Sequence, residues 1–536
     1  MHPALRPWEL PGYAVDVEID FCNPSAMDAL AATVAVDIGT SSSKGVLVDF
    51  SGNVLRTATR EHSPSRPRPG WVEMDARTWW DEFVSICREL LDGDPARVVA
   101  VGVSGMGPCV LLADAEDEPV RAAILYGVDT RSAAQIEELD AALGADEVLQ
   151  RCGSGLSSQA AGAKVLWVAE EEPELFARAA RLYMPSSWLV RHLTGMYILD
   201  HHSASQCTPL YDVHAQGWYE PWVNRICPSL ALPPLAWADD VAGTVTSLAS
   251  EVTGLPAGIP VVTGTIDAWS EAISAGAHGV GDLMLMYGTT MFLVNTVAEP
   301  VAERSLWGPV GALRGTRSLA GGMATTGAVT GWLRDLFASP TYATLLEEAA
   351  ASPPGANGLL MLPYFAGERT PVMDPDARGV VAGLTLSHTR GDLYRAALEA
   401  TGLGVRHNLE TMMRAGARID RVVAVGGGAQ GSLWPQIVSD ITGREQVVPS
   451  QTIGASLGAA FLAATAVADV AIDEWNPPSH ICRPDSRLVS LYDELYQLYL
   501  DLYTRTAPVV HALAQHQHRT TGIAETPPLV NQGANG

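Results

Sequence analysis

Residues 34–49, VAVDIGTSSSKGVLVD, decide the fold of this chain. Two apolar runs, expected to be strands, flank a turn of small and hydroxyl-bearing residues from Gly39 to Ser43. Such a turn suits an anion, because glycine lets a ligand approach the backbone and successive N–H groups form an anion-binding concavity. Asp37, at the end of the first run, offers a carboxylate that can hold Mg²⁺ through water. An ordinary polar hairpin turn fits the same residues.

A second segment of the same kind occurs far along the chain. Residues 283–294 read LMLMYGTTMFLV, in which an apolar run enters a Gly-Thr-Thr turn and another apolar run leaves it. Two such units predict a duplicated architecture, in which each half presents a phosphate-binding hairpin to a shared cleft. The chain has no GxxxxGK[ST], which excludes a Walker P-loop.

Length and composition limit the class of protein. A chain of 536 residues is too long for one core, so two large domains are expected. Its 34 basic and 60 acidic residues give a net charge of −26, which argues against nucleic acid or an anionic membrane as a partner. The seven cysteines are widely spaced without a CxxC pair, and no secretory signal is visible, so a reducing cytoplasm is the expected setting.

The alternation of short apolar runs and helical stretches divides the chain into α/β blocks. We expect an N-terminal extension at 1–31, a first domain at 32–278 and a second domain at 279–505. A final amphipathic helix is expected over residues 488–506. Residues 506–536 are expected to form a flexible tail, because the end of the chain is polar and rich in proline and glycine.

Two further segments carry candidate chemistry. Residues 425–443, VGGGAQGSLWPQIVSDITG, place a strand before three glycines and a helix expected to begin near Ser432. Bare glycine backbone offers a face on which a nucleoside base can lie, although a glycine-rich β–α turn explains the same pattern. Residues 261–267, VVTGTID, end on Asp267 at the head of a helix. A carboxylate there serves either as a general base for a substrate hydroxyl or as a helix N-cap.

Several residues of the first half are candidates for a sugar site, although each of these residue types is also common in solvated or structural roles. They are Glu73, Asp75, Met106, Asp129 and Arg131. Residues 365–371, FAGERTP, are expected to form an ordered loop rather than a catalytic one.

Taken together, these segments resemble the FGGY carbohydrate kinases. The family's order and rough spacing are followed over residues 32–502 by DIGTSSSK, GWVEMDARTWW, LYGVDTR, GTID, YGTT, LPYFAGERTP, GGGAQGSLWPQIVSDITG and GASLGAA. The resemblance implies an α/β fold of two ribonuclease-H-like domains, of the actin and hexokinase type, around a central cleft. It also implies a kinase that transfers the γ-phosphoryl group of Mg-ATP to a hydroxyl of a small sugar, with ATP and Mg²⁺ as cofactors. A homodimer is left open.

The resemblance also implies roles for individual residues. Asp267 matches the family's catalytic base, and Asp37 is the residue expected to bind the magnesium ion. The remaining expected contacts are Gly39, Thr40, Ser41, Ser42, Lys44, Gly288, Thr289 and Thr290 to the ATP phosphates, Gly427, Gly428 and Ser432 to adenosine, and Met106, Asp129, Arg131 and Asp267 to the sugar.

Within the family the chain is most similar to the xylulokinase group, with two departures at the sugar site. That group carries Gln-Met-His-Gly where residues 104–109 read SGMGPC, so Pro108 takes the histidine position. Ala268 follows the catalytic aspartate, where asparagine is common in the group. A pentulose is the first expectation, and ribulose, erythritol, glycerol or another ketose or polyol remains an alternative. A non-enzymatic actin-like ATP-binding regulator is the alternative of another class, against which the intact Asp267 argues.

Overall fold

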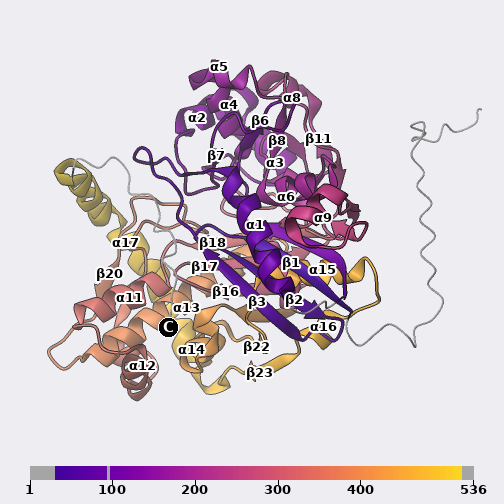
Figure 1. The fold of residues 1–536 in the computed structure, drawn as a ribbon. Coiled ribbons are helices and arrows are strands. Elements are labelled where there is room, and N and C mark those ends of the chain that lie inside the picture. Colours follow the sequence, from indigo (N-terminus) through magenta and orange to yellow (C-terminus); the bar gives the residue numbers. More distant parts are fainter. Residues whose placement is uncertain (1–30, 93–96, 522–536) are drawn as a thin grey trace, which may run out of the picture.

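The computed structural model describes residues 31–92 and 97–521. The expectations for residues 1–30 and 522–536 lie outside this range. Within it, the chain forms two α/β halves, one after the other in sequence (Figure 1). No helix in the described part of the chain is long and apolar enough to cross a membrane.

The first half is built on a mixed sheet. Its strands in spatial order are β13 (Val241–Thr244), β14 (Pro260–Val262), β5 (Arg97–Gly105), β1 (Ala31–Ile38), β2 (Ser42–Asp49) and β3 (Val54–Glu61), with β15 (Thr265–Ile266) also paired to β5. β1 runs antiparallel to β2 and parallel to β5. It is buried along almost its whole length, because helices cover both faces of the sheet.

The second half repeats this plan. Its strands in spatial order are β18 (Arg317–Met323), β17 (Met291–Val297), β16 (Asp282–Tyr287), β21 (Arg421–Val425), β22 (Gln446–Pro449) and β23 (Pro478–Cys482). β16 runs antiparallel to β17 and parallel to β21, as β1 does with β2 and β5. The predicted duplication is therefore confirmed, and each Gly-Thr turn closes the first hairpin of its half.

Two helices lie between the sheets. They are α10 (Asp267–Ser274) and α15 (Ala455–Thr465), and their apolar residues form one buried cluster with residues of both sheets. α15 belongs to the second half of the chain but packs on β1 and β5 of the first half. Thr33 on β1 donates a side-chain hydrogen bond to the carbonyl of Ala460 on α15 over 3.3 Å. The two halves therefore share one core.

Other helices cover the outer faces of the sheets, where they form two separate apolar clusters. On the first sheet these helices are α1 (Ala76–Leu91), α6 (Pro185–Thr194) and α9 (Ser247–Thr253). On the second sheet they are α11 (Gly327–Leu336), α12 (Tyr342–Ala351), α13 (Arg390–Arg414), α14 (Leu433–Thr442) and α17 (Val489–Thr521). The second half also contains the short elements β19 (Leu360–Leu362), β20 (Val380–Ala382) and α16 (Ile472–Trp475).

A smaller layer of helices and short strands with its own apolar core extends the first half, at the top of Figure 1. Its helices are α2 (Ala133–Leu143), α3 (Ala145–Cys152), α4 (Ala161–Glu171), α5 (Pro173–Phe176), α7 (His201–Ser205) and α8 (Glu220–Ile226). The short strands of the first half are β4 (Glu73–Met74), β6 (Leu111–Ala113), β7 (Ala123–Ile124), β8 (Arg181–Tyr183), β9 (Leu199–Asp200), β10 (Tyr211–Asp212), β11 (Gly217–Trp218) and β12 (Leu235–Ala236).

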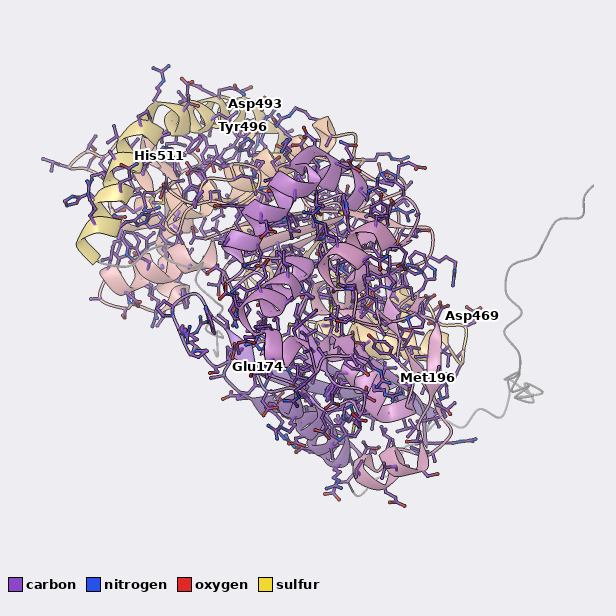
Figure 2. The ribbon with its side chains drawn as sticks, turned by 90° about the horizontal axis from the view of Figure 1, so that it is seen from above. Glu174, Met196, Asp469, Asp493, Tyr496 and His511 are labelled. Carbon is purple, nitrogen blue, oxygen red and sulfur yellow. The ribbon has the colours of Figure 1, made fainter. Side chains whose placement is uncertain are left out.

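The last helix is longer than the sequence pattern indicates. α17, which carries Asp493, Tyr496 and His511 in Figure 2, continues to Thr521, so the expectation of a flexible tail is wrong for residues 506–521. Tertiary contacts explain the difference. Nε2 of His511 and the hydroxyl of Tyr503 each lie 2.7 Å from Oδ2 of Asp374, which ties this part of the helix to the second half.

Candidate active site

Each Gly-Thr turn is closed by a backbone hydrogen bond from its glycine, across residues 39–42 in the first turn and 288–290 in the second. The N–H of Gly39 donates to the carbonyl of Ser42 over 3.0 Å, and the N–H of Gly288 donates to the carbonyl of Thr290 over 3.1 Å. A Cβ atom at Gly39 would lie 2.8 Å from the Ser42 oxygen, and one at Gly288 would lie 3.1 Å from the Thr290 oxygen. Both turns are therefore tight enough to favour glycine, and each carries the hydroxyl-bearing residues expected at a phosphate site.

Three acidic side chains lie near the first turn. They are Asp37 at the end of β1, Asp267 at the start of α10, and Glu271 one turn later on the same helix. Burial raises the pKa of Asp267, and the negative charges of Asp37 and Glu271 raise it further. Burial also raises the pKa of Glu271 to about 7, where the charge of Asp37 adds to the rise and that of Lys44 opposes it.

Asp37 is held in place by its neighbour on β5. The hydroxyl of Ser104 donates a hydrogen bond to Oδ1 of Asp37 over 2.7 Å. Burial raises the pKa of Asp37, while the Ser104 bond and the charge of Lys44 lower it. Lys44 is the cation that counters the charges of Asp37 and Glu271 in this half-buried group of carboxyls.

Asp267 begins α10 but does not cap it. Ile266 is the N-cap residue, and Oδ1 of Asp267 accepts only the N–H of the next residue, Ala268, over 2.7 Å. A capping side chain would accept the N–H two or three residues ahead. Of the two interpretations of this aspartate, the geometry favours the general base. Sequence reasoning missed Glu271, although its spacing of four residues from Asp267 places it on the same helix face.

The glycine segment after β21 forms a turn into α14. Ser432 is the N-cap residue of this helix, as the sequence predicts. A Cβ atom at Gly428 would lie 2.7 Å from the ring of Trp434, so Gly428 is required for that ring to pack. A Cβ atom at Gly427 would have no atom of another residue within 4 Å, which leaves its backbone open to a ligand.

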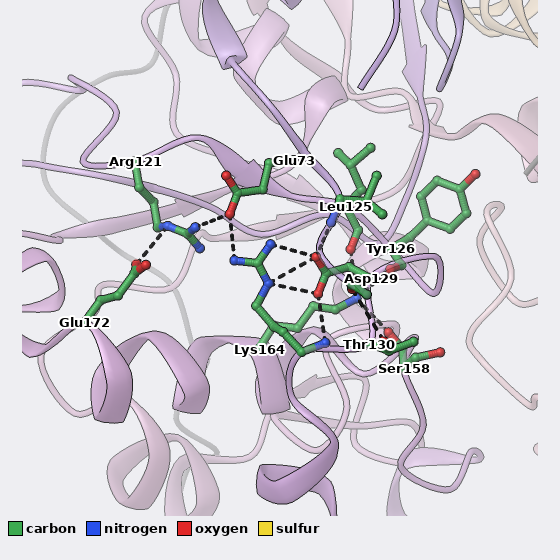
Figure 3. Close-up of polar contacts among 12 residues, drawn as sticks. Glu73, Arg121, Leu125, Tyr126, Asp129, Thr130, Ser158, Lys164 and Glu172 are labelled. Atoms are coloured by element: carbon green, nitrogen blue, oxygen red, sulfur yellow. Dashed lines mark hydrogen bonds and ion pairs between the residues drawn. The ribbon is translucent and has the colours of Figure 1, made fainter. Parts of the chain in front are cut away.

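Asp129 and Arg131 form a buried ion pair instead of standing free. Nη2 of Arg131 lies 2.7 Å from Oδ2 of Asp129, and its Nη1 donates to Oε1 of Glu73 over 2.7 Å (Figure 3). The guanidinium also lies 4.1 Å from the ring centre of Trp71. These contacts occupy the polar groups of both residues, so their predicted contact with a sugar stays a prediction without structural support. Met106, 1% exposed, follows β5.

A buried lysine fixes the loop that leads to this ion pair. Nζ of Lys164 donates to the carbonyls of Leu125, Tyr126 and Ser158 over 2.8, 2.7 and 2.6 Å (Figure 3). Burial lowers the pKa of Lys164 to about 8. The hydroxyl of Tyr126 in turn lies 2.8 Å from Oγ1 of Thr40 in the first turn. Sequence reasoning missed Tyr126 and Lys164. The signal that could have revealed Lys164 is the position of a lysine within the apolar stretch of α4.

The 365–371 loop brings two charged residues to the second half of the site. Oε1 of Glu368 accepts the backbone N–H groups of Ala324 and Arg369 over 2.7 and 2.8 Å. Nη2 of Arg369 donates to the carbonyl of Met323 over 2.9 Å, at the end of β18. The charge of Arg369 acts on Tyr126, which belongs to the first half. This loop is therefore within electrostatic reach of a residue that is hydrogen-bonded to the first turn.

Comparison with known proteins agrees with this arrangement. Models of the N- and C-terminal domains of the FGGY family of carbohydrate kinases match residues 32–274 and 283–467. The chain is 27% identical to the xylulose kinase of Bacillus subtilis (strain 168) over 498 residues, which cover 90% of this chain and 98% of that protein. It is 32% identical to the glycerol kinase of Nocardia farcinica (strain IFM 10152) over 455 residues, which cover 81% and 89%.

A solved structure of similar fold leads to the same class. The xylulose kinase from Rhodospirillum rubrum has a TM-score of 0.84 and 32% identity, and the match covers 90% of this chain and all of that one. The chain belongs to the FGGY family of carbohydrate kinases. It is a sugar kinase with the two-domain fold that the sequence predicts.

Proposed function

We propose that this kinase transfers the γ-phosphoryl group of Mg-ATP to a hydroxyl of a small ketose or polyol, with a pentulose as the first candidate. The observation that carries the proposal is Asp267, a half-buried carboxyl group with a raised pKa that is not used as a helix cap. The names of the relatives, xylulose kinases and glycerol kinases, support this class of acceptor.

Asp267 acts as the general base. It accepts the proton of the acceptor hydroxyl while that oxygen forms a bond to the γ-phosphorus and the bond from phosphorus to the ADP oxygen breaks. A buried carboxylate with a raised pKa is a stronger base than an exposed one, so it holds this proton better at neutral pH. Closure of the two halves would exclude water and limit hydrolysis of ATP.

The two turns bind the nucleotide from opposite halves. Residues 39–42 with Lys44 bind phosphates from the first half, and residues 288–290 bind them from the second half. Gly427, Gly428 and Ser432 border the adenosine. In this proposal each half contributes one hairpin, which agrees with the equivalent places of the two hairpins in their sheets.

The oxygen donors of the site fit a magnesium ion. Mg²⁺ is bound by one or two carboxylates together with water and substrate phosphates. Asp37, with Asp267 near it, would hold the ion, which supplies charge neutralisation for the ATP phosphates when bound. Among the described residues, no three His, Cys, Asp or Glu side chains gather as metal ligands, which is consistent with a site completed by the nucleotide.

The acceptor site departs from that of the xylulokinase group. Pro108 and Ala268 cannot supply the side-chain hydrogen bonds of a histidine and an asparagine. A site that hydrogen-bonds hydroxyls discriminates strongly, because unmatched buried polar groups cost free energy. We therefore expect an acceptor other than D-xylulose to be the best substrate.

An ADP-release screen tests the proposal. We would compare kcat/KM for D-xylulose, D- and L-ribulose, erythritol and glycerol, with Asp267→Asn as the inactive control. A marked preference for D-xylulose would show that Pro108 and Ala268 do not stand at the positions of the histidine and asparagine that bind the sugar in the xylulokinase group. ATP turnover that no sugar or polyol stimulates would contradict a kinase and favour an actin-like regulator.

A further inference from the structure

Arg369 carries a positive charge that forms no ion pair within the described part of the chain. Its side chain is half-buried. Nη2 donates to the carbonyl of Met323, but the buried Nε has no hydrogen-bond partner. Burial lowers the pKa of this guanidinium. A buried charge is costly unless it is paired, so a ligand is the natural source of the missing partner.

The second sheet is shaped to hold this guanidinium at the site. A Cβ atom at Gly322 on β18 would lie 3.2 Å from Nη2 of Arg369 and 3.2 Å from the ring of Phe292. Gly322 therefore lets the guanidinium and the ring approach the same stretch of backbone. The next residue, Met323, accepts the Arg369 hydrogen bond and pairs with Met291, which directly follows the second Gly-Thr turn.

Arg369 also reaches the first half of the molecule. Burial raises the pKa of Tyr126 to about 12, and the positive charge of Arg369 opposes this rise. The negative charge of Asp267 acts on the same phenol, and Thr40 of the first turn is hydrogen-bonded to it. Arg369 is therefore bonded to the strand pair that follows the second turn and acts electrostatically on Tyr126, which is bonded to the first turn.

The neighbouring carboxylate of Glu368 favours the charged guanidinium but forms no ion pair with it. Glu368 uses Oε1 to accept two backbone N–H groups, and its Oε2 has no partner. Burial raises the pKa of Glu368 to about 7, with the charge of Arg369 as the last of the opposing effects. The two side chains are adjacent in sequence, yet they form no ion pair within 4.0 Å.

We propose that Arg369 binds an oxyanion of the reactants during phosphoryl transfer, an inference that rests on the proposed function. A guanidinium with free N–H groups matches phosphate and carboxylate oxygens in a fork geometry. Two sources share this chemistry. One is the phosphoryl group, present with every acceptor, and the other is a carboxylate on an acidic acceptor such as an aldonate.

The test compares Arg369→Gln and Arg369→Lys with the wild-type enzyme. Arg418→Gln is the matched control, because the Arg418 side chain is 80% exposed and paired with Asp420. We would measure the ligand-free Tm, the affinity for ATP and ADP, and kcat with the best neutral acceptor and with D-gluconate. Arg369→Gln should lose roughly 10²–10³ in kcat, as expected for one lost oxyanion contact. Arg369→Lys keeps the charge and should lose less.

The outcomes separate the two sources. If the Arg369 variants lose kcat with neutral acceptors, and their affinity for ATP falls more than their affinity for ADP, the oxyanion is that of the phosphoryl group. A loss confined to D-gluconate identifies the acceptor carboxylate. Unchanged kcat with both acceptors overturns the proposal.

Stability provides a second test. Because the guanidinium forms no ion pair in the free protein and its Nε has no hydrogen-bond partner, the ligand-free Tm of Arg369→Gln should equal or exceed that of wild type. A variant that unfolds or melts well below wild type overturns the proposal, because the guanidinium is then satisfied within the protein. If wild type phosphorylates no acceptor, the proposed function fails instead. In that case the affinities of wild type and Arg369→Gln for ATP and for D-gluconate are compared. If the substitution changes neither affinity, the proposed role of Arg369 is overturned.

Discussion

The hydroxyl of Tyr126 lies 2.8 Å from Oγ1 of Thr40, and this hydrogen bond joins two parts of the site. Thr40 belongs to the first Gly-Thr turn, which is expected to bind phosphate. Tyr126 begins the loop that Lys164 and the Asp129–Arg131 ion pair hold in place. The loop that carries Asp129 and Arg131 is therefore linked directly to the first Gly-Thr turn.

Replacing Tyr126 by phenylalanine removes this link and leaves the ring in place. A hydrogen bond contributes about 0.5–1.5 kcal/mol, so kcat/KM should fall about 2–10-fold. Tyr342→Phe, on the partly exposed α12, is the control. Steady-state kinetics with both substrates measure the effect. Unchanged kcat/KM for ATP and for the acceptor would show that the bond does not position the reactants.

Asp267→Asn should abolish most of the activity. The amide has nearly the shape of the carboxylate but cannot accept the acceptor's proton, and general base catalysis contributes about 10²–10⁴-fold to kcat. Nucleotide affinity should change little. Asp469→Asn, at an exposed position, is the control. Near-normal phosphorylation by Asp267→Asn in a coupled ADP assay would remove Asp267 from the role of base.

Local patterns made much of the fold predictable. Each Gly-Thr turn stands between two apolar runs, and both runs form strands that pair across the turn. Asp267 follows a strand and begins a helix, so its exit from the sheet was readable from the sequence. The equivalence of the two halves followed from the repeated turn, and the matching strand order confirms it.

The parts that could not be predicted depend on contacts between distant residues. The residue types of Asp129 and Arg131 suit a sugar, but Glu73 and Trp71 reach them only in the folded chain and occupy the guanidinium. The sequence predicted only an ordered loop around Arg369. Its electrostatic interaction with Tyr126 could not be predicted, because the two residues belong to different halves of the chain.

The C-terminal tail was misjudged from composition. Residues 506–521 are polar on average, yet Val510 and Ala514 are buried, and His511 is bonded to Asp374 of the second half. Helical stability in proteins comes largely from such tertiary contacts, which composition does not report.

Gly288→Val should weaken ATP binding. A valine Cβ would lie 3.1 Å from the Thr290 carbonyl, and its methyl groups would stand where phosphate is expected to approach. We expect at least about a tenfold loss in ATP affinity by calorimetry, the size of a roughly 1.4 kcal/mol steric cost. Gly217→Val, where a Cβ meets no atom within 4 Å, is the control. Unchanged ATP affinity in a folded Gly288→Val protein would make the second turn structural only.

Glu368 makes the stability of the ligand-free protein depend on pH. Burial raises the pKa of this carboxyl from 4.5 to about 7. The folded protein thus binds the Glu368 proton more tightly than the unfolded chain does. The stabilisation is fully present below pH 4.5 and is lost as pH rises through 7. The shift corresponds to a loss on the order of 3 kcal/mol.

Glu368→Gln should remove this dependence. The glutamine oxygen can still accept the N–H groups of Ala324 and Arg369, and the side chain stays neutral at every pH. Its advantage in Tm over wild type should therefore be small at pH 5 and should grow up to pH 8. Thermal melts across this range test the prediction, with the exposed Glu347→Gln as the control. A constant difference in Tm between Glu368→Gln and wild type would mean that Glu368 keeps the same charge in the folded and unfolded chains. In that case the two backbone N–H bonds, together with the nearby Arg369, would stabilise the carboxylate enough to offset its burial.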